Sequence, residues 1–140
     1  MKKKYKVGYT TGVFDMFHIG HLNIIKRAKE QCDYLIVGVS TDEVVESYKH
    51  KKPVIPFEQR KTIIEAIKYV DEVVPQVNMD KYEAWKKYHF EAIFHGDEWK
   101  GSDMYNEIEA KLKAVGCDMV FLPHTDGVST SQIVRKVHDK

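Results

Sequence analysis

The sequence contains little cysteine, no long hydrophobic run and almost no net charge. Its two cysteines, Cys32 and Cys117, show no spacing typical of a zinc site or a disulfide framework. No apolar stretch approaches the ~20 residues that a membrane-spanning helix needs. A net charge of +1, from 22 Lys and Arg against 21 Asp and Glu, gives no support for general nucleic-acid binding, which usually shows a marked basic excess.

Features that would divide the chain or direct it to a membrane are also missing. There is no internal repeat, low-complexity tract or linker, and the three lysines at residues 2–4 lead into a predicted strand rather than a secretion signal. We therefore expect one cytoplasmic domain spanning residues 1–140, with no nucleic-acid partner and no membrane insertion.

Strand-like and helix-like segments alternate along the chain. Apolar runs predict strands at residues 5–10, 33–39, 71–75, 91–95 and 118–122. Helical spacing predicts helices at residues 21–31, from 41 onward, 57–69, 80–88, 104–115 and from 127–131 to about 138. This order predicts an α/β fold: a single-domain, Rossmann-like, doubly wound parallel sheet of five strands with helices on both faces. In such sheets ligands bind beyond the carboxyl ends of the strands.

A turn with two histidines lies between the first predicted strand and the first predicted helix. His18 and His21 are three residues apart, so they lie on the same side of a first helical turn. Gly20 removes a side chain that would hold a ligand away from the backbone, and the helix start offers free N–H groups and a positive dipole end. The pattern favours polyphosphate binding, although an accidental surface pair or a metal pair has the same spacing.

Three further segments follow predicted strands or their helices and would meet this turn at the same edge of the sheet. They are the lysine-rich loop at residues 48–56, the segment at 96–99 and the segment at 124–131. Lys49, Lys51 and Lys52 offer either a site for a second anionic group or a solvated surface. Ser129, Thr130 and Ser131 offer either a second grip on the polyphosphate or a helix cap.

The chemistry that these segments favour is direct in-line transfer. No arrangement of cysteine, serine–histidine or lysine residues suggests a covalent intermediate. Two anion sites with histidine donors instead suit a phosphate monoester that attacks the α-phosphorus of a nucleoside triphosphate, with pyrophosphate leaving. We expect Mg²⁺ to arrive with the triphosphate, because phosphates usually hold most of this ion, and we expect no dedicated metal ligands in the chain.

Two motifs carry a resemblance to a known family. Gly12-Val13-Phe14-Asp15, followed by His18-Ile19-Gly20-His21, resembles the first signature of the cytidylyltransferase branch of the nucleotidyltransferase superfamily. Residues 125–131, with the sequence TDGVSTS, resemble its second signature, whose usual form is RTEGISTT. The resemblance covers essentially the whole chain. In length and layout the chain is most similar to the bacterial members that use glycerol 3-phosphate.

The resemblance implies a homodimer that transfers CMP from CTP to a phospho-alcohol, with glycerol 3-phosphate as the favoured acceptor, and releases a CDP-alcohol and pyrophosphate. It assigns catalytic roles to His18, His21, Lys49, Ser129 and Thr130. It assigns nucleotide binding to Gly12, Val13, Phe14, Asp15, His18, Gly20, His21, Lys68, Asp97, His124, Thr125, Gly127, Val128, Ser129, Thr130 and Ser131. It assigns acceptor binding to Lys49, Lys51, Arg60 and Lys81.

The chain departs from the family pattern at three positions. His124 and Lys68 stand where the family has arginines that contact the nucleotide, and Met79 replaces a tryptophan of the enzymes that use glycerol 3-phosphate. Arginine is always charged and binds phosphate with a two-pronged fork. Histidine is not always charged and has no such fork. The His124 change therefore bears on rate and pH dependence, and the Met79 change bears on the alcohol.

Several alternatives remain open at this point. The acceptor could be phosphocholine, phosphoethanolamine, or a polyol or sugar phosphate, and an archaeal-type FMN adenylyltransferase has a similar length and histidine motif. The residues Gly127 to Ser131 favour a CTP user. Pantetheine-phosphate adenylyltransferase is disfavoured, because its motif begins with threonine where this chain has His18. A non-catalytic nucleotide sensor is the alternative from another class, since one fold hosts many functions.

Overall fold

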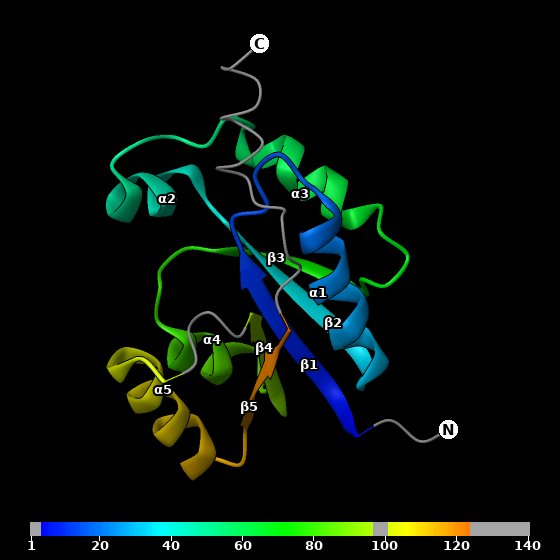
Figure 1. The fold of residues 1–140 in the computed structure, drawn as a ribbon, viewed down its shortest axis with the longest axis vertical. Coiled ribbons are helices and arrows are strands. Elements are labelled where there is room, and N and C mark those ends of the chain that lie inside the picture. The colour runs from blue at the N-terminus through cyan, green and yellow to red at the C-terminus, as the bar shows by residue number, and fades with distance from the viewer. Residues whose placement is uncertain (1–3, 97–100, 124–140) are drawn as a thin grey trace.

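A parallel sheet of five strands forms the centre of the molecule in the computed structural model, which describes residues 4–96 and 101–123 (Figure 1). The strands are β1 (Tyr5–Gly12), β2 (Cys32–Ser40), β3 (Glu72–Gln76), β4 (Ala92–Gly96) and β5 (Asp118–Leu122). They lie in the order β3-β2-β1-β4-β5, and every neighbouring pair is parallel. The predicted five-stranded, doubly wound parallel sheet is confirmed.

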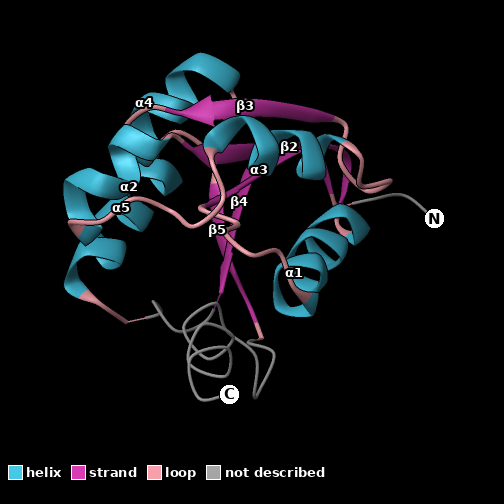
Figure 2. Ribbon diagram, turned by 90° about the horizontal axis from the view of Figure 1, so that it is seen from above, coloured by secondary structure: helices cyan, strands magenta, loops and turns pink. Residues whose placement is uncertain are grey.

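Helices cover both faces of this sheet (Figure 2). They are α1 (Ile19–Glu30), α2 (Asp42–Lys49), α3 (Phe57–Glu65), α4 (Lys81–Tyr88) and α5 (Asp103–Ala114). Helices α1 and α3 pack on one face, and α4 and α5 pack on the other. Side chains alternate between the two faces of a strand, so each strand contributes to two separate cores.

The two cores follow that alternation residue by residue. In β4, Phe94 points to the α1 and α3 face, whereas Ile93 points to the α4 and α5 face. The first core contains Tyr5, Phe14, Ile25, Ala28, Cys32, Leu35, Val37, Val39, Ile64, Ala92, Phe94 and Leu122. The second contains Tyr9, Ile36, Val74, Phe90, Ile93, Tyr105, Leu112, Cys117 and Met119. Because both faces of the sheet are covered, β2 and β4 contain continuous apolar runs, at residues 35–39 and 92–94.

Two helix boundaries differ from the sequence prediction by two residues or more. Helix α1 begins at Ile19, two residues earlier than expected, because His18 acts as its N-cap. Helix α3 ends at Glu65 rather than at residue 69. Past that point the N–H groups of Ala66 and Ile67 bond to carbonyls three residues back, and the chain turns so that Ile67 packs on the first core.

The strand order places a ligand site at one edge of the sheet. The connections step outward from β1 through β2 to β3, then cross to β4 and β5 on the other side. The carboxyl ends of β1 and β4 therefore flank the point where the order reverses, which is where open α/β sheets bind ligands. Within residues 4–96 and 101–123, no helix is both long and apolar enough to cross a membrane.

Candidate active site

The two histidines of the β1–α1 turn cap helix α1 together. The Gly20 backbone N–H donates to Nδ1 of His18 over 3.1 Å, and the His18 backbone N–H donates to Nδ1 of His21 over 3.2 Å. Each imidazole thus satisfies a backbone donor that the helix itself leaves unpaired. Because Nδ1 is the acceptor in both rings, the neutral rings carry their proton on Nε2, where it can be donated to a ligand.

The rings of His18 and His21 are stacked, with centroids 3.8 Å apart and planes 24° apart. The His21 ring also meets the ring of Phe14 edge-on, at 5.5 Å. Burial, and secondarily the nearby His18, lower the pKa of His21 to about 4, and the carboxylate of Asp15 opposes this shift only in part. His21 is therefore a neutral hydrogen-bond donor at neutral pH. A bound polyphosphate would raise its pKa, since a nearby anion favours the protonated form.

The turn itself has an unusual backbone. Phe14 and Met16 have φ angles of 54° and 50°, in the left-handed region, which costs a residue other than glycine about 1 kcal/mol. The surrounding structure holds this conformation, because the Phe14 side chain is buried in the first core. Such strain is common at ligand sites, where it fixes groups in position before the ligand arrives.

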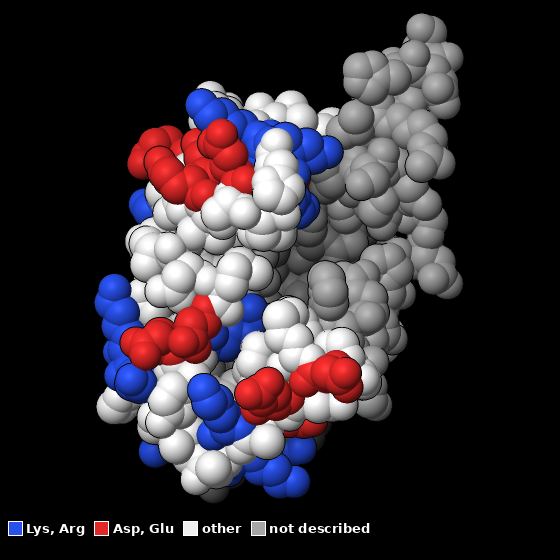
Figure 3. Space-filling view, turned by 90° about the vertical axis from the view of Figure 1, so that its left-hand side faces the viewer, with Lys and Arg blue, Asp and Glu red and all other residues white. Residues whose placement is uncertain are grey.

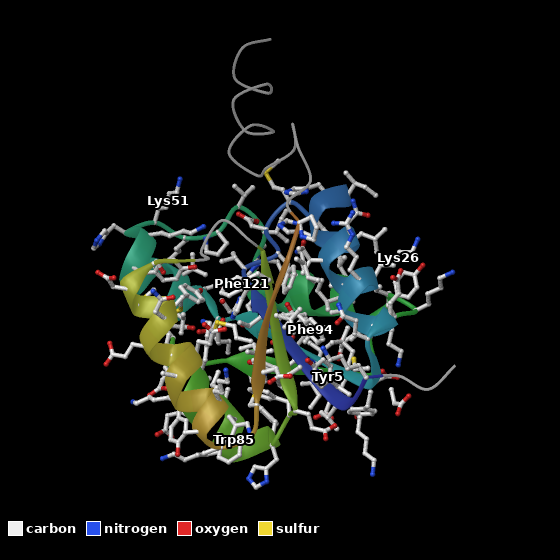
Figure 4. The ribbon with its side chains drawn as sticks, turned by 60° about the horizontal axis from the view of Figure 1, so that its bottom comes forward. Tyr5, Lys26, Lys51, Trp85, Phe94 and Phe121 are labelled. Atoms are coloured by element: carbon white, nitrogen blue, oxygen red, sulfur yellow. The ribbon has the colours of Figure 1, made fainter. Side chains whose placement is uncertain are left out.

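Asp15 joins this turn to the lysine-rich loop. Its carboxylate oxygens accept the backbone N–H groups of Val54 and Ile55, at 2.7 and 2.8 Å. Lys49 ends α2 and Lys51 follows it, and both are exposed. The Lys51 side chain extends outward beside α2 (Figure 4). The structure therefore brings the lysine-rich loop to the histidine turn, as the sequence predicts, and Asp15 makes the connection through its side chain.

Arg60 of α3 is fully buried and bonds to protein groups from four segments. Its Nε donates to the carbonyl of Ile55 over 2.8 Å, and its Nη1 donates to the carbonyls of Val13 and Ser40 over 2.8 and 2.7 Å. Its Nη2 pairs with Asp42 of α2 over 2.6 Å. Sequence reasoning placed Arg60 at the acceptor. Its burial and these bonds make it a positioning residue that ties the ends of β1 and β2 to the loop.

The structure does not bring Lys68 to the histidines of its own chain. Lys68 lies between the end of α3 and the start of β3, so it is at the amino end of the sheet, opposite the His18–His21 turn. It is exposed, and its Nζ lies 5.2 Å from the centre of the Tyr69 ring. Its predicted nucleotide contact stays a prediction.

The remaining predicted residues divide into two groups. Gly12 ends β1 and Val13 follows it, so both lie directly before the histidine turn. Asp97, His124, Thr125, Gly127, Val128, Ser129, Thr130, Ser131 and the predicted last helix lie outside the described residues and stay predictions. Pro123, which comes shortly before the second signature, contacts α1. Nη1 of Arg27 donates a hydrogen bond to its carbonyl over 2.9 Å.

Sequence reasoning missed a polar network at the carboxyl ends of the strands. Oε1 of Gln76, the last residue of β3, accepts from the hydroxyls of Thr11 and Ser40 at 2.5 and 2.7 Å. It thereby joins the ends of β1, β2 and β3. The only signal in the sequence is a polar residue at the end of each of these strands, which does not reveal that one amide bonds to both neighbours.

The charges on one face of the molecule show no field of one sign. On the side formed by α2, α4 and α5, acidic and basic side chains alternate in small groups (Figure 3). Among the described residues, no group of three or more His, Cys, Asp or Glu is placed to hold a metal ion. The expectation that Mg²⁺ comes with the nucleotide stays a prediction.

A doubly wound sheet with a pair of capping histidines at a helix start, beside the point where the strand order reverses, defines a nucleotide-binding type of α/β domain. Comparison with known proteins identifies the family of this domain. The model of the cytidylyltransferase-like family matches residues 9–136, and the chain belongs to this family.

Curated relatives agree with that assignment, and a solved structure shares the fold. The chain is 43% identical over 126 residues to glycerol-3-phosphate cytidylyltransferase of Bacillus spizizenii, covering 89% of this chain and 91% of the relative. It is 33% identical to FAD synthase of Thermococcus sibiricus, covering 98% and 96%. The fold is that of a lipopolysaccharide core biosynthesis protein from Thermoplasma volcanium, with a TM-score of 0.72 and 24% identity, covering 86% and 97%.

Proposed function

We propose that this protein is a nucleotidyltransferase that transfers CMP from CTP to glycerol 3-phosphate, giving CDP-glycerol and pyrophosphate. The observation that carries the proposal is the histidine pair capping α1, with Nδ1 of both rings engaged. The match to the cytidylyltransferase-like family and the 43% identity to a glycerol-3-phosphate cytidylyltransferase support it.

In the proposed reaction the histidines meet the triphosphate at the start of α1. A phosphate oxygen of the acceptor forms a bond to the α-phosphorus of CTP, and the bond from that phosphorus to the bridging oxygen breaks. Pyrophosphate leaves with the electron pair. His18 and His21 donate hydrogen bonds from Nε2 to oxygens whose negative charge grows in the transition state, which lowers the barrier more than it strengthens ground-state binding.

The lysine-rich loop would hold the acceptor phosphate. In this proposal Lys49 and Lys51 supply the positive charge for that phosphate. Asp15 and Arg60 hold the loop against the histidine turn through the backbone of Val54 and Ile55. Two anions that repel one another in water are thus brought together, and positioning of this kind contributes much of the rate of a phosphoryl-type transfer. Mg²⁺ would accompany CTP, neutralise phosphate charge and be held mainly by phosphate oxygens.

A panel of substrates tests this function. The protein is incubated with Mg²⁺ and CTP or ATP, against glycerol 3-phosphate, phosphocholine, phosphoethanolamine, ribitol 5-phosphate and FMN, and pyrophosphate release is followed. The proposal predicts release with CTP and glycerol 3-phosphate. Release only with ATP and FMN would overturn it in favour of FMN adenylyltransferase, the second candidate, which the 33% identity to an FAD synthase favours. Nucleotide binding with no release from any pair would indicate a sensor.

The proposal includes a homodimer, as the family resemblance implies, and a location in the cytoplasm, as the sequence features lead us to expect. Sedimentation equilibrium of the purified protein tests the oligomeric state. A mass of twice the chain's 16.3 kDa is expected, and a monomer at micromolar concentration would contradict it.

A further inference from the structure

Backbone pairing between β1 and β2 stops just before the histidine turn. The last paired residues are Gly12 of β1 and Val39 of β2, and among the described strands none pairs with Val13. Thr11 and Ser40 place a hydroxyl near each of these two strand ends. The position at which the turn leaves the sheet therefore depends on side-chain contacts.

One buried amide makes such a contact across three strands. Gln76 ends β3 and is 8% exposed. Its Oε1 accepts from the hydroxyl of Thr11 at 2.5 Å and from the hydroxyl of Ser40 at 2.7 Å. Because β2 lies between β1 and β3, the bond from Thr11 reaches over β2. Strand residues two apart share a face, and Tyr9 and Val74 belong to the second core, so this network lies on the α4 and α5 face.

A glycine in β2 leaves the space that the network occupies. Gly38 pairs with Thr11 on one side and with Val74 on the other. A Cβ atom at Gly38 would overlap the hydroxyl of Tyr9 and would lie 3.2 Å from Oγ1 of Thr11. The hydroxyls of Tyr9 and Thr11 are themselves hydrogen-bonded. A side chain at this position would therefore displace the groups through which Gln76 reaches β1.

Arg60 holds the same junction through backbone carbonyls. Its Nη1 donates to the carbonyls of Val13 and Ser40. Ser40 is thus held twice, by its hydroxyl at Gln76 and by its carbonyl at Arg60. Val13 directly precedes Phe14, where the left-handed backbone of the turn begins. A shift of the strand ends would therefore pass directly into the histidine turn.

Gln76 also borders a groove. With Tyr9 and Lys81 among others, it lines a space of about 310 Å³. Lys81 begins α4 and is 4% exposed, and its predicted contact with the acceptor stays a prediction. Its Nζ lies 5.6 Å from the centre of the Tyr105 ring, which the buried His95 meets edge-on. Gln76 thus lies between this groove and the histidine turn.

We propose that Gln76 is a positioning residue for CMP transfer, which fixes the histidine turn through Thr11 and Ser40. The proposal rests on the proposed function. Hydrogen-bond donors to a transition state must lie at the right distance from oxygens whose charge grows, and a small displacement of such donors costs rate more than it costs ground-state binding. Gln76 acts through the strand ends and contacts no reacting atom.

Steady-state kinetics of Gln76 variants test this role. Gln76→Met keeps an unbranched side chain of similar size and removes the acceptor oxygen. We expect kcat with CTP and glycerol 3-phosphate to fall roughly tenfold or more, and both KM values to stay within about threefold. Gln76→Glu keeps an oxygen that can accept from both hydroxyls, so it should recover most of the lost kcat.

A double-mutant cycle tests whether Gln76 acts through Thr11. Thr11→Val removes only the hydroxyl that donates to Gln76, and it should also lower kcat. The variant that carries both Thr11→Val and Gln76→Met should lose little more kcat than Gln76→Met alone, because residues that share one contact are not additive. Losses that simply multiply would contradict action through this bond. Thr11→Val also decides the question if Gln76→Met does not fold.

Tyr5→Phe is the matched control for Thr11→Val. Tyr5 lies at the opposite end of β1, and its hydroxyl donates to Asp118 of β5 over 2.7 Å, across β4. The control thus also removes one hydroxyl of β1 that reaches over a neighbouring strand, but at the end away from the turn. It should lower the melting temperature by a similar amount and leave kcat unchanged.

The imidazole ¹⁵N signals of His18 and His21 report on the turn without any turnover. They should move in Gln76→Met and Thr11→Val, and should stay in place in Tyr5→Phe. A purely structural role for Gln76 would lower stability in all three variants without this difference between them.

The outcomes distinguish the two proposals. If the unaltered protein makes CDP-glycerol, but Gln76→Met and Thr11→Val keep its kcat and its histidine signals, the positioning role is wrong and the function stands. A loss of kcat in Tyr5→Phe as large as in Thr11→Val would also overturn the positioning role. If the unaltered protein releases no pyrophosphate from CTP with any acceptor, the proposed function is wrong, and the positioning role in CMP transfer is wrong with it.

Discussion

His18 and His21 cap the same helix start, each ring accepting a backbone hydrogen bond at Nδ1, and their ring centroids lie 3.8 Å apart. This arrangement fixes where both Nε2 atoms lie before any ligand arrives. Preorganised donors need no rearrangement in the transition state, which makes them effective in stabilising growing charge.

Removing either ring should therefore reduce turnover strongly. We expect His18→Ala or His21→Ala to lower kcat with CTP and glycerol 3-phosphate by roughly a hundredfold or more, the usual effect of losing a transition-state donor. Steady-state kinetics measure this, with His89→Asn as a control, because His89 is exposed at the end of α4. Unchanged kcat in either histidine variant would remove that residue from the mechanism.

Lys51 should act mainly on the acceptor. We expect Lys51→Ala to raise the KM for glycerol 3-phosphate several-fold, by roughly 1 kcal/mol for an exposed charge, and to change the KM for CTP less. Lys26→Ala is the control, since Lys26 lies on α1 at the opposite side of the molecule from Lys51 (Figure 4). The reverse pattern, with CTP affected more, would assign the loop to the nucleotide.

Asp15 offers a test between positioning and direct nucleotide contact. Asp15→Asn keeps one acceptor oxygen for the N–H groups of Val54 and Ile55, so the loop should loosen at a cost of about 1–2 kcal/mol. We expect a higher KM for glycerol 3-phosphate, a lower melting temperature and nearly unchanged CTP binding by calorimetry. A large loss of CTP affinity with normal thermal stability would instead support the nucleotide contact that the sequence suggests.

Arg60 should matter for stability as well as activity. In Arg60→Met, three carbonyls and the Asp42 carboxylate lose their donor, and breaking such a buried network costs about 3 kcal/mol or more. Urea denaturation measures the loss. Arg60→Lys should be nearly as damaging, because an ammonium cannot replace a planar fork that reaches four acceptors. A small loss in both variants would contradict this role.

The buried His95 and the partly buried His21 make the fold sensitive to mild acid. Burial lowers the pKa of His21 to about 4 and that of His95 to about 3, from 6.5. As pH falls below about 6.5 the unfolded chain binds protons at these positions and the folded protein does not, so the free energy of unfolding decreases toward pH 4. The loss should be on the order of 2 kcal/mol after allowance for solvent screening.

Urea midpoints at pH 7 and pH 4.5 measure this dependence. The His95→Leu variant should lose less stability between the two pH values than the unaltered protein, since one of the two titrating groups is absent. Carboxylates titrate in both proteins, so the difference between them isolates the histidine. An equal pH dependence in both proteins would show that His95 is not buried in neutral form.

The fold and the histidine turn of the site follow from local patterns in the sequence. The β–α alternation predicts the sheet, and the residues around Gly20 predict the histidine turn, because strand ends, helix starts and glycines are local signals. The end of α3 was harder to predict. Ile67 keeps the helical apolar spacing past Glu65, but the structure uses it in a turn that packs on the first core.

The roles of Asp15, Arg60 and His95 depend on contacts between distant segments. The family resemblance assigns Arg60 to binding of the phospho-alcohol, and only the folded chain places three carbonyls and the Asp42 carboxylate around its guanidinium. His95 follows the alternation of β4, which gives its face but not its neighbour Lys81. No spacing in a single sequence indicates either contact.

Identification of the product by ³¹P NMR, after incubation with CTP, Mg²⁺ and glycerol 3-phosphate, tests the central claim most directly. The account predicts the diphosphate signals of CDP-glycerol together with pyrophosphate from the unaltered protein, and neither above background from His18→Ala. Unreacted CTP and glycerol 3-phosphate after incubation with the folded, unaltered protein would contradict it.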